Sequence, residues 1–480
     1  MILLDFVAKA AATFPNAIAL RDFSREKKWT YLQLEAETAR LAFDLHQRNF
    51  QRGDLLATHA RNSSEHLLLL LAALRMGVKI FPISFRLPRE EAANYVDFLG
   101  AKFVDIDSFA PSLCSKRRYS ELGSAAFLPA TYLLTSGSSA TPKIVVHSLQ
   151  AHLAAAFASQ YHLPVKPGSC WLLDLSLSHI SGLSIIFRCI LHGACMSVCS
   201  TQEGALLALR NFSASKITHL SMVSTQLQKA VESGIQLQEA EAILLGGGPI
   251  LKAPLKTALQ QNAPLYLTYG MTETASQIAT STRLILADAE ARRCGQALPG
   301  RSIRIASDGE ILVRSDSLAL GYLTLDSKKK QSSPNNLESL LTNDEADNER
   351  VGWFCTKDIG ELDEKGLRVL GRKDRCFISG GENIQPESLE CVLESLPSIR
   401  RAVVVPYPDT NFGRLPLAFI STDMPRTLWE KEIVEPLRKK LPKFAIPRKF
   451  LEWPTEIDPT LAKQPIQIFI KKASSLIEKS

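Results

Sequence analysis

Short apolar runs alternate with longer helix-like stretches over the first 300 residues of the chain. An apolar segment at Leu67–Leu74 precedes a short run at 78–81, and a run at 217–220 precedes another at 243–245. The segment at Leu67–Leu74 predicts a buried helix, and the three short runs are typical of buried strands. Their alternation indicates an α/β fold with layered, largely parallel sheets and helices.

The pattern changes after about residue 323. Residues 324–350 are polar and charged, with three consecutive lysines at 328–330. We expect a mobile surface insertion there, without a catalytic role. Strand-like alternation resumes at Gly366–Leu370.

A compact basic module is predicted at the C-terminal end. A helix is expected from about Pro386, a strand at 401–405 and a second helix near 429–440. We therefore expect a large N-terminal α/β domain over residues 1–373 and a small, mobile α+β domain over residues 374–480.

Composition narrows the class of protein. At 480 residues and 45% apolar content, the chain can bury large cores in two or more domains. Its net charge of +7 suits small anionic substrates and does not imply nucleic acid. Nine cysteines without a CxxC pair indicate reduced thiols. No run reaches membrane-spanning length, and Met1–Asp5 lacks the basic flank of a signal peptide, so we expect a cytoplasmic protein.

The stretch most suggestive of chemistry is a hydroxyl-rich loop at Thr135–Lys143, between apolar runs at 132–134 and 144–146. Its hydroxyls, glycine and lysine would form a cradle for a triphosphate between two strands. It is not a Walker A loop, because Pro142 and Ile144 flank the lysine. An ordinary surface loop is the alternative. The candidate phosphate ligands are Thr135, Ser136, Gly137, Ser138, Ser139, Thr141 and Lys143.

This loop resembles the phosphate-binding signature of the acyl-adenylate-forming enzymes, which include acyl-CoA synthetases, adenylation domains and luciferases. Four further stretches fit the same family in the same order, so the resemblance spans nearly the whole chain. These stretches are 269–277 (the second core motif), 353–360 (the ribose-binding motif), 371–375 with 379–384 (the hinge and the loop beyond it) and 461–463 (the adenylation lysine). The resemblance implies ATP, Mg²⁺ and coenzyme A as cofactors and substrates.

In that family a carboxylate attacks the α-phosphorus of ATP and expels pyrophosphate, so cations and aimed donors must offset the developing charge. The resemblance implies that Thr272 contacts the α-phosphate and Glu273 holds Mg²⁺. It also implies that Lys463 bridges the acyl carboxylate and the α-phosphate. Glu273 could instead be a helix first-turn acid. For Lys463 the alternative is a surface lysine, with Lys471 and Lys472 as substitutes.

The resemblance also places the nucleotide. Asp358 would accept both ribose hydroxyls, with Arg372 as a further donor. The triple glycine at 246–248 would pack against adenine. An ordinary turn is the alternative for both Asp358 and the glycines. The candidate nucleotide-binding residues are Gly246, Gly247, Gly248, Tyr269, Gly270, Asp358 and Arg372.

A mobile C-terminal module needs a hinge, and the resemblance places it at Asp374. Four positions depart from the family pattern, and one of them is Ala462, which precedes Lys463 where the family has glycine. Ala140 and Lys357 stand where relatives have glycine, and Ile144 stands where a small residue is usual. We expect these changes to affect the rate more than the function.

The acid is indicated by the segment Trp171–Gly182 and its continuation to Arg188. With 142–147, 269–278 and 379–386, it resembles the o-succinylbenzoate–CoA ligases of menaquinone biosynthesis. A buried second carboxylate needs a cation, and the resemblance assigns that role to Arg188. A helix-surface arginine is the alternative. The candidate substrate-binding residues are His179, Arg188 and Ser276, with His179 as a pocket-wall or core histidine rather than an acid–base catalyst.

The resemblance thus implies an ATP-dependent acid–CoA ligase that forms an acyl-AMP and then an acyl-CoA, with AMP and pyrophosphate released. Its favoured acid is o-succinylbenzoate. The alternatives are an aryl- or fatty-acyl-CoA ligase, an enzyme that loads a carrier protein, and a weakly catalytic adenylate-binding protein.

Overall fold

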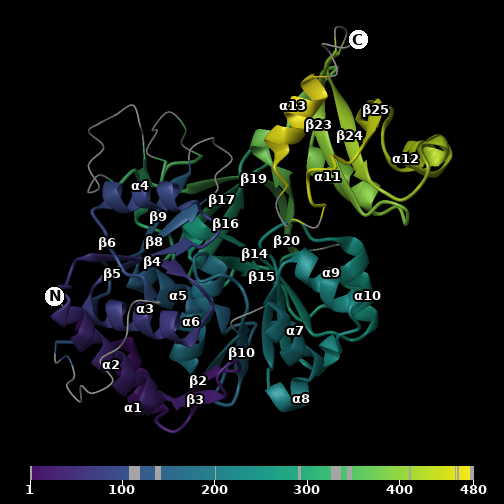
Figure 1. Cartoon of the computed structure of the whole chain (residues 1–480). Helices are drawn as coiled ribbons and strands as arrows, with labels where there is room; N and C mark the ends of the chain where they lie inside the picture. The colour runs from purple at the N-terminus through teal and green to yellow at the C-terminus, as the bar shows by residue number, and fades with distance from the viewer. Residues whose placement is uncertain are drawn as a thin grey trace.

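Two large sheets form the body of the protein, and a smaller module lies beside it at upper right in Figure 1. None of the helices in the described part of the chain is both long and apolar enough to cross a membrane. The computed structural model describes residues 3–106, 119, 121–135, 142–199, 202–289, 293–325, 337–342, 347, 349–409, 412–459, 461 and 464–475.

The larger sheet has eight strands, of which the six central ones are parallel and the two edge strands antiparallel. The central strands are short, apolar and buried, as expected for a parallel sheet covered on both faces. In spatial order the eight strands of this sheet are β15 (Ser276–Thr280), β14 (Leu265–Met271), β13 (Ala242–Leu245), β12 (His219–Met222), β10 (Cys170–Leu173), β11 (Cys195–Val198), β2 (Ile18–Asp22) and β3 (Lys27–Thr30).

The second sheet has six strands. Four of them are parallel, and an antiparallel hairpin followed by β18 extends one edge. In spatial order they are β18 (Gly321–Thr324), β9 (Lys143–Ser148), β8 (Pro129–Thr135), β5 (Lys79–Ser84), β4 (Leu55–Ala60) and β6 (Lys102–Phe103). The prediction of layered, largely parallel sheets is therefore confirmed.

Helices connect and cover these strands. The predicted apolar helix is α3 (Ser64–Met76), which is buried along its length in a core that includes residues of both sheets. A helix apolar on every side must lie inside the protein, and α3 does. The other helices of the body are α1 (Phe6–Thr13), α2 (Tyr31–Gln47), α4 (Arg89–Leu99), α5 (Leu149–Ser159), α6 (Ile180–His192), α7 (Gln202–Arg210), α8 (Phe212–Ser215), α9 (Ser224–Glu232) and α10 (Lys252–Gln260).

A four-stranded antiparallel sheet follows the eight-stranded sheet in the chain, an element that the apolar pattern had not resolved. Its strands are β16 (Arg301–Ile305), β17 (Glu310–Ser315), β19 (Phe354–Asp363) and β20 (Gly366–Arg372). Most of the predicted mobile insertion at 324–350 lies outside the described residues. The described segment 337–342 within it bridges to Tyr322 and Phe354, and Thr342 of that segment bridges to Val351.

The C-terminal module has separate hydrophobic cores. Among the described residues, its two clusters contain only residues from Phe377 onward, whereas the clusters of the body end at Val369. The predicted boundary at 374 falls between these two sets. The elements of the module are β21 (Phe377–Ser379), β22 (Glu382–Ile384), α11 (Pro386–Glu394), β23 (Arg401–Asp409), β24 (Gly413–Ser421), α12 (Glu435–Lys440), β25 (Lys449–Glu452) and α13 (Ile466–Ser474).

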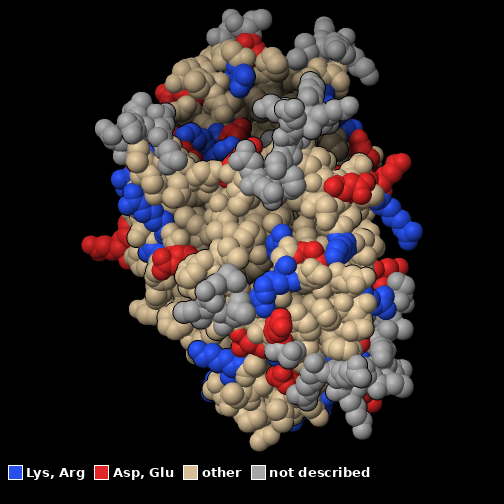
Figure 2. All heavy atoms as spheres, turned by 90° about the vertical axis from the view of Figure 1, so that its left-hand side faces the viewer, with Lys and Arg blue, Asp and Glu red and all other residues tan. Residues whose placement is uncertain are grey.

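The predicted elements of this module are present, with one difference. The helix expected near 429–440 is a π-helical turn at Glu430–Val434 that continues into α12. Figure 2 shows acidic and basic side chains interspersed over one face of the molecule. The modest net positive charge is therefore not gathered there into one basic region.

Candidate active site

The strands that flank the candidate phosphate loop form the predicted hairpin. Thr135 pairs with Lys143, and the Thr135 Oγ1 hydroxyl donates to the Lys143 carbonyl over 3.2 Å. Residues 136–141 of the loop, including Ser136, Gly137, Ser138, Ser139, Ala140 and Thr141, lie outside the described part of the chain. Ile144, one of the departures from the family pattern, is the second residue of β9 and is fully buried in a hydrophobic core.

Lys143 and Glu273 meet at a shared tyrosine. The Lys143 ammonium lies 4.6 Å from the centre of the Tyr322 ring, and the Tyr322 hydroxyl donates to Glu273 Oε1 over 2.8 Å. The lysine at the end of the phosphate loop therefore lies on the same side of the site as the candidate Mg²⁺ ligand. Sequence reasoning missed Tyr322, because a tyrosine at the edge of a polar segment carries no distinguishing signal.

The oxygen chemistry at Glu273 suits Mg²⁺. One carboxylate oxygen accepts from Tyr322. Mg²⁺ is commonly held by one or two carboxylates together with substrate phosphates and water. Among the described residues there is no cluster of three or more acidic, histidine or cysteine ligands. Glu273 thus fits a metal that is carried in largely by the nucleotide phosphates.

The segment after β14 adopts a tight turn with unusual backbone angles. A 3-10 turn at Thr272–Thr274 is followed by Ala275 at φ 51° and Ser276 at φ 108°. Left-handed backbone in residues with side chains is costly and persists only where the surroundings enforce it. A Cβ on Gly270 would lie 1.8 Å from the Ser276 carbonyl oxygen, so this position requires glycine.

A buried carboxylate network lies at the end of β19. Asp358 accepts from the Tyr269 hydroxyl over 2.8 Å and from Arg372 Nη1 over 3.2 Å. Arg372 also pairs with Asp374, 3.2 Å away. Burial raises the pKa of the Asp358 carboxyl, and the Arg372 guanidinium opposes that effect. Four residues predicted separately from sequence are therefore neighbours in space.

The triple glycine follows β13 at the carboxyl edge of the parallel sheet, where open α/β sheets bind ligands. A Cβ on Gly246 would lie 2.6 Å from the Thr268 methyl carbon, and Gly247 has φ 77°. Gly246 therefore allows close packing against β14, and Gly247 supplies the left-handed turn. Gly248 continues the same bend.

Arg188 is a fully buried cation in the middle of α6. Its Nη2 donates to the Ser276 hydroxyl over 2.9 Å, and its guanidinium lies 5.3 Å from the centre of the Trp171 ring. No carboxylate in the described part of the chain forms an ion pair with it, and its Nε has no hydrogen-bond partner. Burial lowers the pKa of Arg188 to about 10. The alternative of a helix-surface arginine is wrong.

His179 is the N-cap residue of α6 and is exposed, so it is not a core histidine. It lies nine positions before Arg188, roughly 13 Å along the helix axis. Gly182, in the first turn, is needed because a Cβ there would lie 2.3 Å from the Ser176 carbonyl oxygen. The structure thus brings Arg188 into contact with Ser276, whereas His179 lies at the N-terminal end of α6.

His147 is a further residue that sequence reasoning did not assign. Its Nε2 donates to the Thr272 carbonyl over 2.6 Å, and burial lowers the pKa of its imidazole to about 4. It therefore stays neutral near pH 7 and ties the strand after Lys143 to the turn that carries Thr272 and Glu273. Its only signal in the sequence is its place in the apolar run after the phosphate loop.

The departure at Lys357 has a structural consequence. Lys357 adopts φ 61°, the left-handed region in which glycine is favoured, and its N–H donates to Glu310 Oε1 over 2.9 Å. The backbone there adopts a turn that glycine would form at less conformational cost. Lys463 and Ala462, the predicted adenylation lysine and its neighbour, lie outside the described residues.

The described site thus holds the Asp358–Arg372 pair, the turn with Thr272 and Glu273, and the buried Arg188 beside Ser276. Residues 7–124 and 124–323 match the family model described as AMP-binding enzyme, and residues 388–460 match that of the AMP-binding enzyme C-terminal domain. The chain belongs to the AMP-binding enzyme family.

Two similar relatives are both 2-succinylbenzoate–CoA ligases. The chain is 32% identical over 452 residues to the 2-succinylbenzoate–CoA ligase of Escherichia coli (strain K12), covering 92% of both chains. It is 32% identical over 456 residues to that of Haemophilus influenzae, covering 93% of both.

Solved structures agree with the fold. The chain resembles o-succinylbenzoate coenzyme A synthetase (MenE) from Bacillus subtilis in complex with ATP and magnesium ion, with a TM-score of 0.81 and 26% identity. That match covers 96% of this chain and 98% of the other. It also resembles E. coli MenE bound to an analogue of OSB-AMS, with a TM-score of 0.79, 28% identity and 98% and 100% coverage.

Proposed function

We propose that this protein is an ATP-dependent acid–CoA ligase that converts o-succinylbenzoate to its CoA thioester through an acyl-adenylate, as in menaquinone biosynthesis. The observation that carries the choice of acid is Arg188, a buried guanidinium without a carboxylate partner among the described residues. A substrate with two carboxylates supplies that partner, because one carboxylate reacts while the other remains charged and buried.

The nucleotide lies across the carboxyl edge of the larger sheet. Asp358 accepts the two ribose hydroxyls, and Arg372, which already contacts Asp358, donates to the same sugar. Gly246, Gly247 and Gly248 present bare backbone to the adenine. Tyr269 holds the Asp358 carboxylate in place through its hydroxyl, and Gly270 allows the turn beneath it.

The acid's reacting carboxylate attacks the α-phosphorus, the bond to pyrophosphate breaks, and pyrophosphate leaves. The loop from Thr135 to Lys143 holds the outer phosphates, and Thr272 donates to the α-phosphate. Glu273 holds Mg²⁺, which when bound neutralises phosphate charge. These residues supply positioning and electrostatic stabilisation, which is where catalysis of phosphoryl chemistry originates.

The C-terminal module contributes Lys463 to the first half-reaction, between the acyl carboxylate and the α-phosphate. Reorientation about Asp374 then admits coenzyme A, whose thiolate attacks the acyl-adenylate carbonyl and releases AMP. The ion pair between Asp374 and Arg372 supports this proposal, since it joins the hinge to the ribose site. The domains of this proposal are residues 1–373 and 374–480.

The function is tested by measuring pyrophosphate release with ATP, Mg²⁺ and a panel of acids, with and without coenzyme A. Turnover led by o-succinylbenzoate and resolved by free coenzyme A supports the proposal. Preference for a fatty or simple aryl acid would favour the aryl- or fatty-acyl ligase alternative. ATP binding without pyrophosphate release across the panel would indicate a weakly catalytic adenylate-binding protein.

We also propose a cytoplasmic location. The thiols of Cys170, Cys189, Cys195, Cys199, Cys294, Cys355 and Cys376 form no disulfide, which is the state that a reducing compartment maintains.

A further inference from the structure

A second buried arginine lies on the far side of the turn that presents Ser276 to Arg188. Arg301, at the start of β16, is 9% exposed and donates from Nε to the Gln277 carbonyl over 2.9 Å. Its Nη2 donates to the Ser317 hydroxyl over 3.1 Å. The Ser317 hydroxyl in turn donates to the Thr274 carbonyl over 2.8 Å.

These hydrogen bonds hold both ends of the strained segment from Thr274 to Gln277. Between Thr274 and Gln277 lie Ala275 and Ser276, both with positive φ, so the backbone needs outside partners to keep this shape. Within the turn, the Thr274 hydroxyl donates to the Ser276 carbonyl over 2.9 Å. The fork of a guanidinium can hold two acceptors at a fixed separation, which an ammonium cannot do.

The other half of the turn is held independently. The Thr272 carbonyl accepts from His147 Nε2 over 2.6 Å, and the Glu273 carbonyl accepts from the Ala319 N–H over 2.8 Å. Loosening the Arg301 end would therefore move Ser276 while leaving Thr272 and Glu273 attached.

We propose that Arg301, acting through Ser317, is a positioning residue that holds the Thr274–Gln277 turn so that Ser276 and Arg188 form one binding site for the acid's second carboxylate. Arg301 also adds a second buried positive charge near that site, close enough to Arg188 to disfavour its protonation further. The inference rests on the proposed acid–CoA ligase function.

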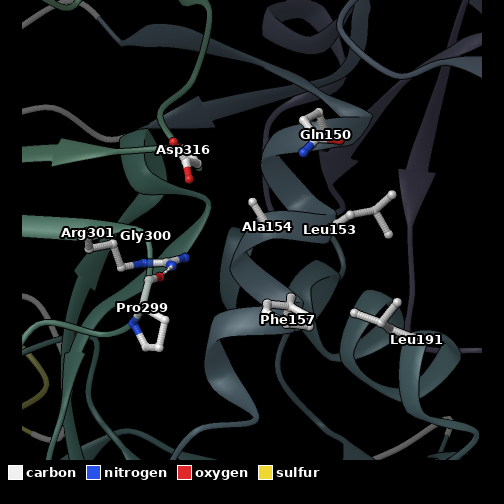
Figure 3. A pocket seen from close by; sticks show the side chains of 9 residues that line it. All are labelled: Gln150, Leu153, Ala154, Phe157, Leu191, Pro299, Gly300, Arg301 and Asp316. Atoms are coloured by element: carbon white, nitrogen blue, oxygen red, sulfur yellow. Dashed lines mark hydrogen bonds between the residues drawn. The ribbon is translucent and has the colours of Figure 1, made fainter.

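A cavity beside Arg301 makes the proposal testable by chemical rescue. Arg301 lines a space of about 420 Å³ between α5 and the start of β16, with Gln150 and Phe157 on the opposite wall. Figure 3 shows Arg301 and Asp316 on one side of this cavity and the residues of α5 on the other. Such a space can admit a small guanidinium ion to the place vacated by a truncated side chain.

The experiment compares wild type, Arg301→Lys, Arg301→Ala and Ser317→Ala. The matched control is Arg75→Lys, a fully buried arginine of α3 that binds Asp5 and Glu35. We expect Arg301→Lys to raise the KM for o-succinylbenzoate about tenfold, the loss of one charge-assisted bond. The KM for ATP should change by less than about twofold, because Thr272 and Glu273 keep their own partners. Added methylguanidinium should lower the raised KM of Arg301→Ala.

If Arg301 stabilised the fold without positioning Ser276, the variants would give a different result. Arg75→Lys should lower the Tm without changing either KM. The proposal is overturned if the Arg301 variants behave like this control, if both KM values rise together, or if methylguanidinium has no effect on Arg301→Ala. Failure of the proposed function is recognised separately, because wild type would then not release pyrophosphate with o-succinylbenzoate. In that case the same KM comparison is made with the acid that wild type accepts.

Discussion

Replacing Arg188 with methionine should separate the contribution of Arg188 to substrate binding from its contribution to folding stability. Burial lowers the pKa of Arg188 to about 10, which corresponds to about 3 kcal/mol against the charged form. Methionine removes that cost, but it also removes the bond to Ser276 and the contact with Trp171, together roughly 2 kcal/mol. We therefore expect the free energy of unfolding to stay unchanged or to rise by about 1 kcal/mol.

Activity should change in the opposite direction. The charge-assisted bond to the acid's second carboxylate contributes roughly 1.5–3 kcal/mol, so kcat/KM for o-succinylbenzoate should fall about ten- to a hundredfold. Two analogues of o-succinylbenzoate each lack one of its carboxylates, and the one that is still turned over serves as the comparison substrate. Its kcat/KM should change less than about threefold. Pyrophosphate release measures the activity, and urea unfolding measures the stability.

Arg75→Met is the matched control, since Arg75 is equally buried but pairs with Asp5 and Glu35. Breaking a buried ion pair leaves carboxylates unpaired and costs about 3–5 kcal/mol. If Arg188→Met were destabilised to the same extent, with equal losses on both acids, then Arg188 would be a structural residue and the choice of acid would lose its support.

Three further changes have definite expected outcomes. Lys463→Ala should abolish adenylation yet spare coenzyme A attack on pre-formed acyl-adenylate; equal loss of both half-reactions would contradict its assignment. Lys357→Gly should raise the free energy of unfolding in urea by about 0.5–1 kcal/mol, because relief of a left-handed lysine exceeds the entropy cost of glycine; a decrease would mean that the lysine side chain contributes more. The pKa of His147 is lowered to about 4 in the folded protein, so as the pH falls the unfolded chain binds this proton before the folded chain does. The free energy of unfolding should therefore fall by about 3 kcal/mol as the pH drops from about 6.5 to 4. His147→Gln should reduce that slope in urea unfolding between pH 7 and 5, with the remainder due to buried His152 and His219, and an unchanged slope would contradict the assignment to His147.

The sequence predicted the layered sheets well, because they depend on local signals. The buried strands and α3 follow from uninterrupted apolar runs, whereas Asp358 and Arg372 were assigned from the family resemblance and are neighbours in the structure. The antiparallel sheet of β16, β17, β19 and β20 was not resolved. Its edge residues mix exposed and buried positions, and its strands pair across a gap of 38 residues between Ser315 and Phe354.

The partners of the motif residues could not be predicted either. Tyr322 reaches Glu273 from 49 residues away, and His147 reaches Thr272 from 125 residues away. His147 lies in an apolar run and Tyr322 lies at the edge of a polar segment, so neither position carries a local signal for its partner. Only the arrangement of strands in three dimensions shows that these side chains are aimed at the site.

Arg75 and Arg188 show why charge in an apolar helix is ambiguous from sequence alone. Both lie within strongly apolar helices and both are fully buried. The carboxylates that pair with Arg75 come from positions 70 and 40 residues away, so no local pattern reveals that its charge is satisfied. Arg188 has a serine and an aromatic ring where Arg75 has two carboxylates. A buried charge without an opposite charge is costly to keep, and it persists where a ligand completes it. The Arg188 guanidinium, which has no carboxylate partner among the residues that the structure describes, is therefore the strongest structural reason to assign a dicarboxylic acid to this enzyme.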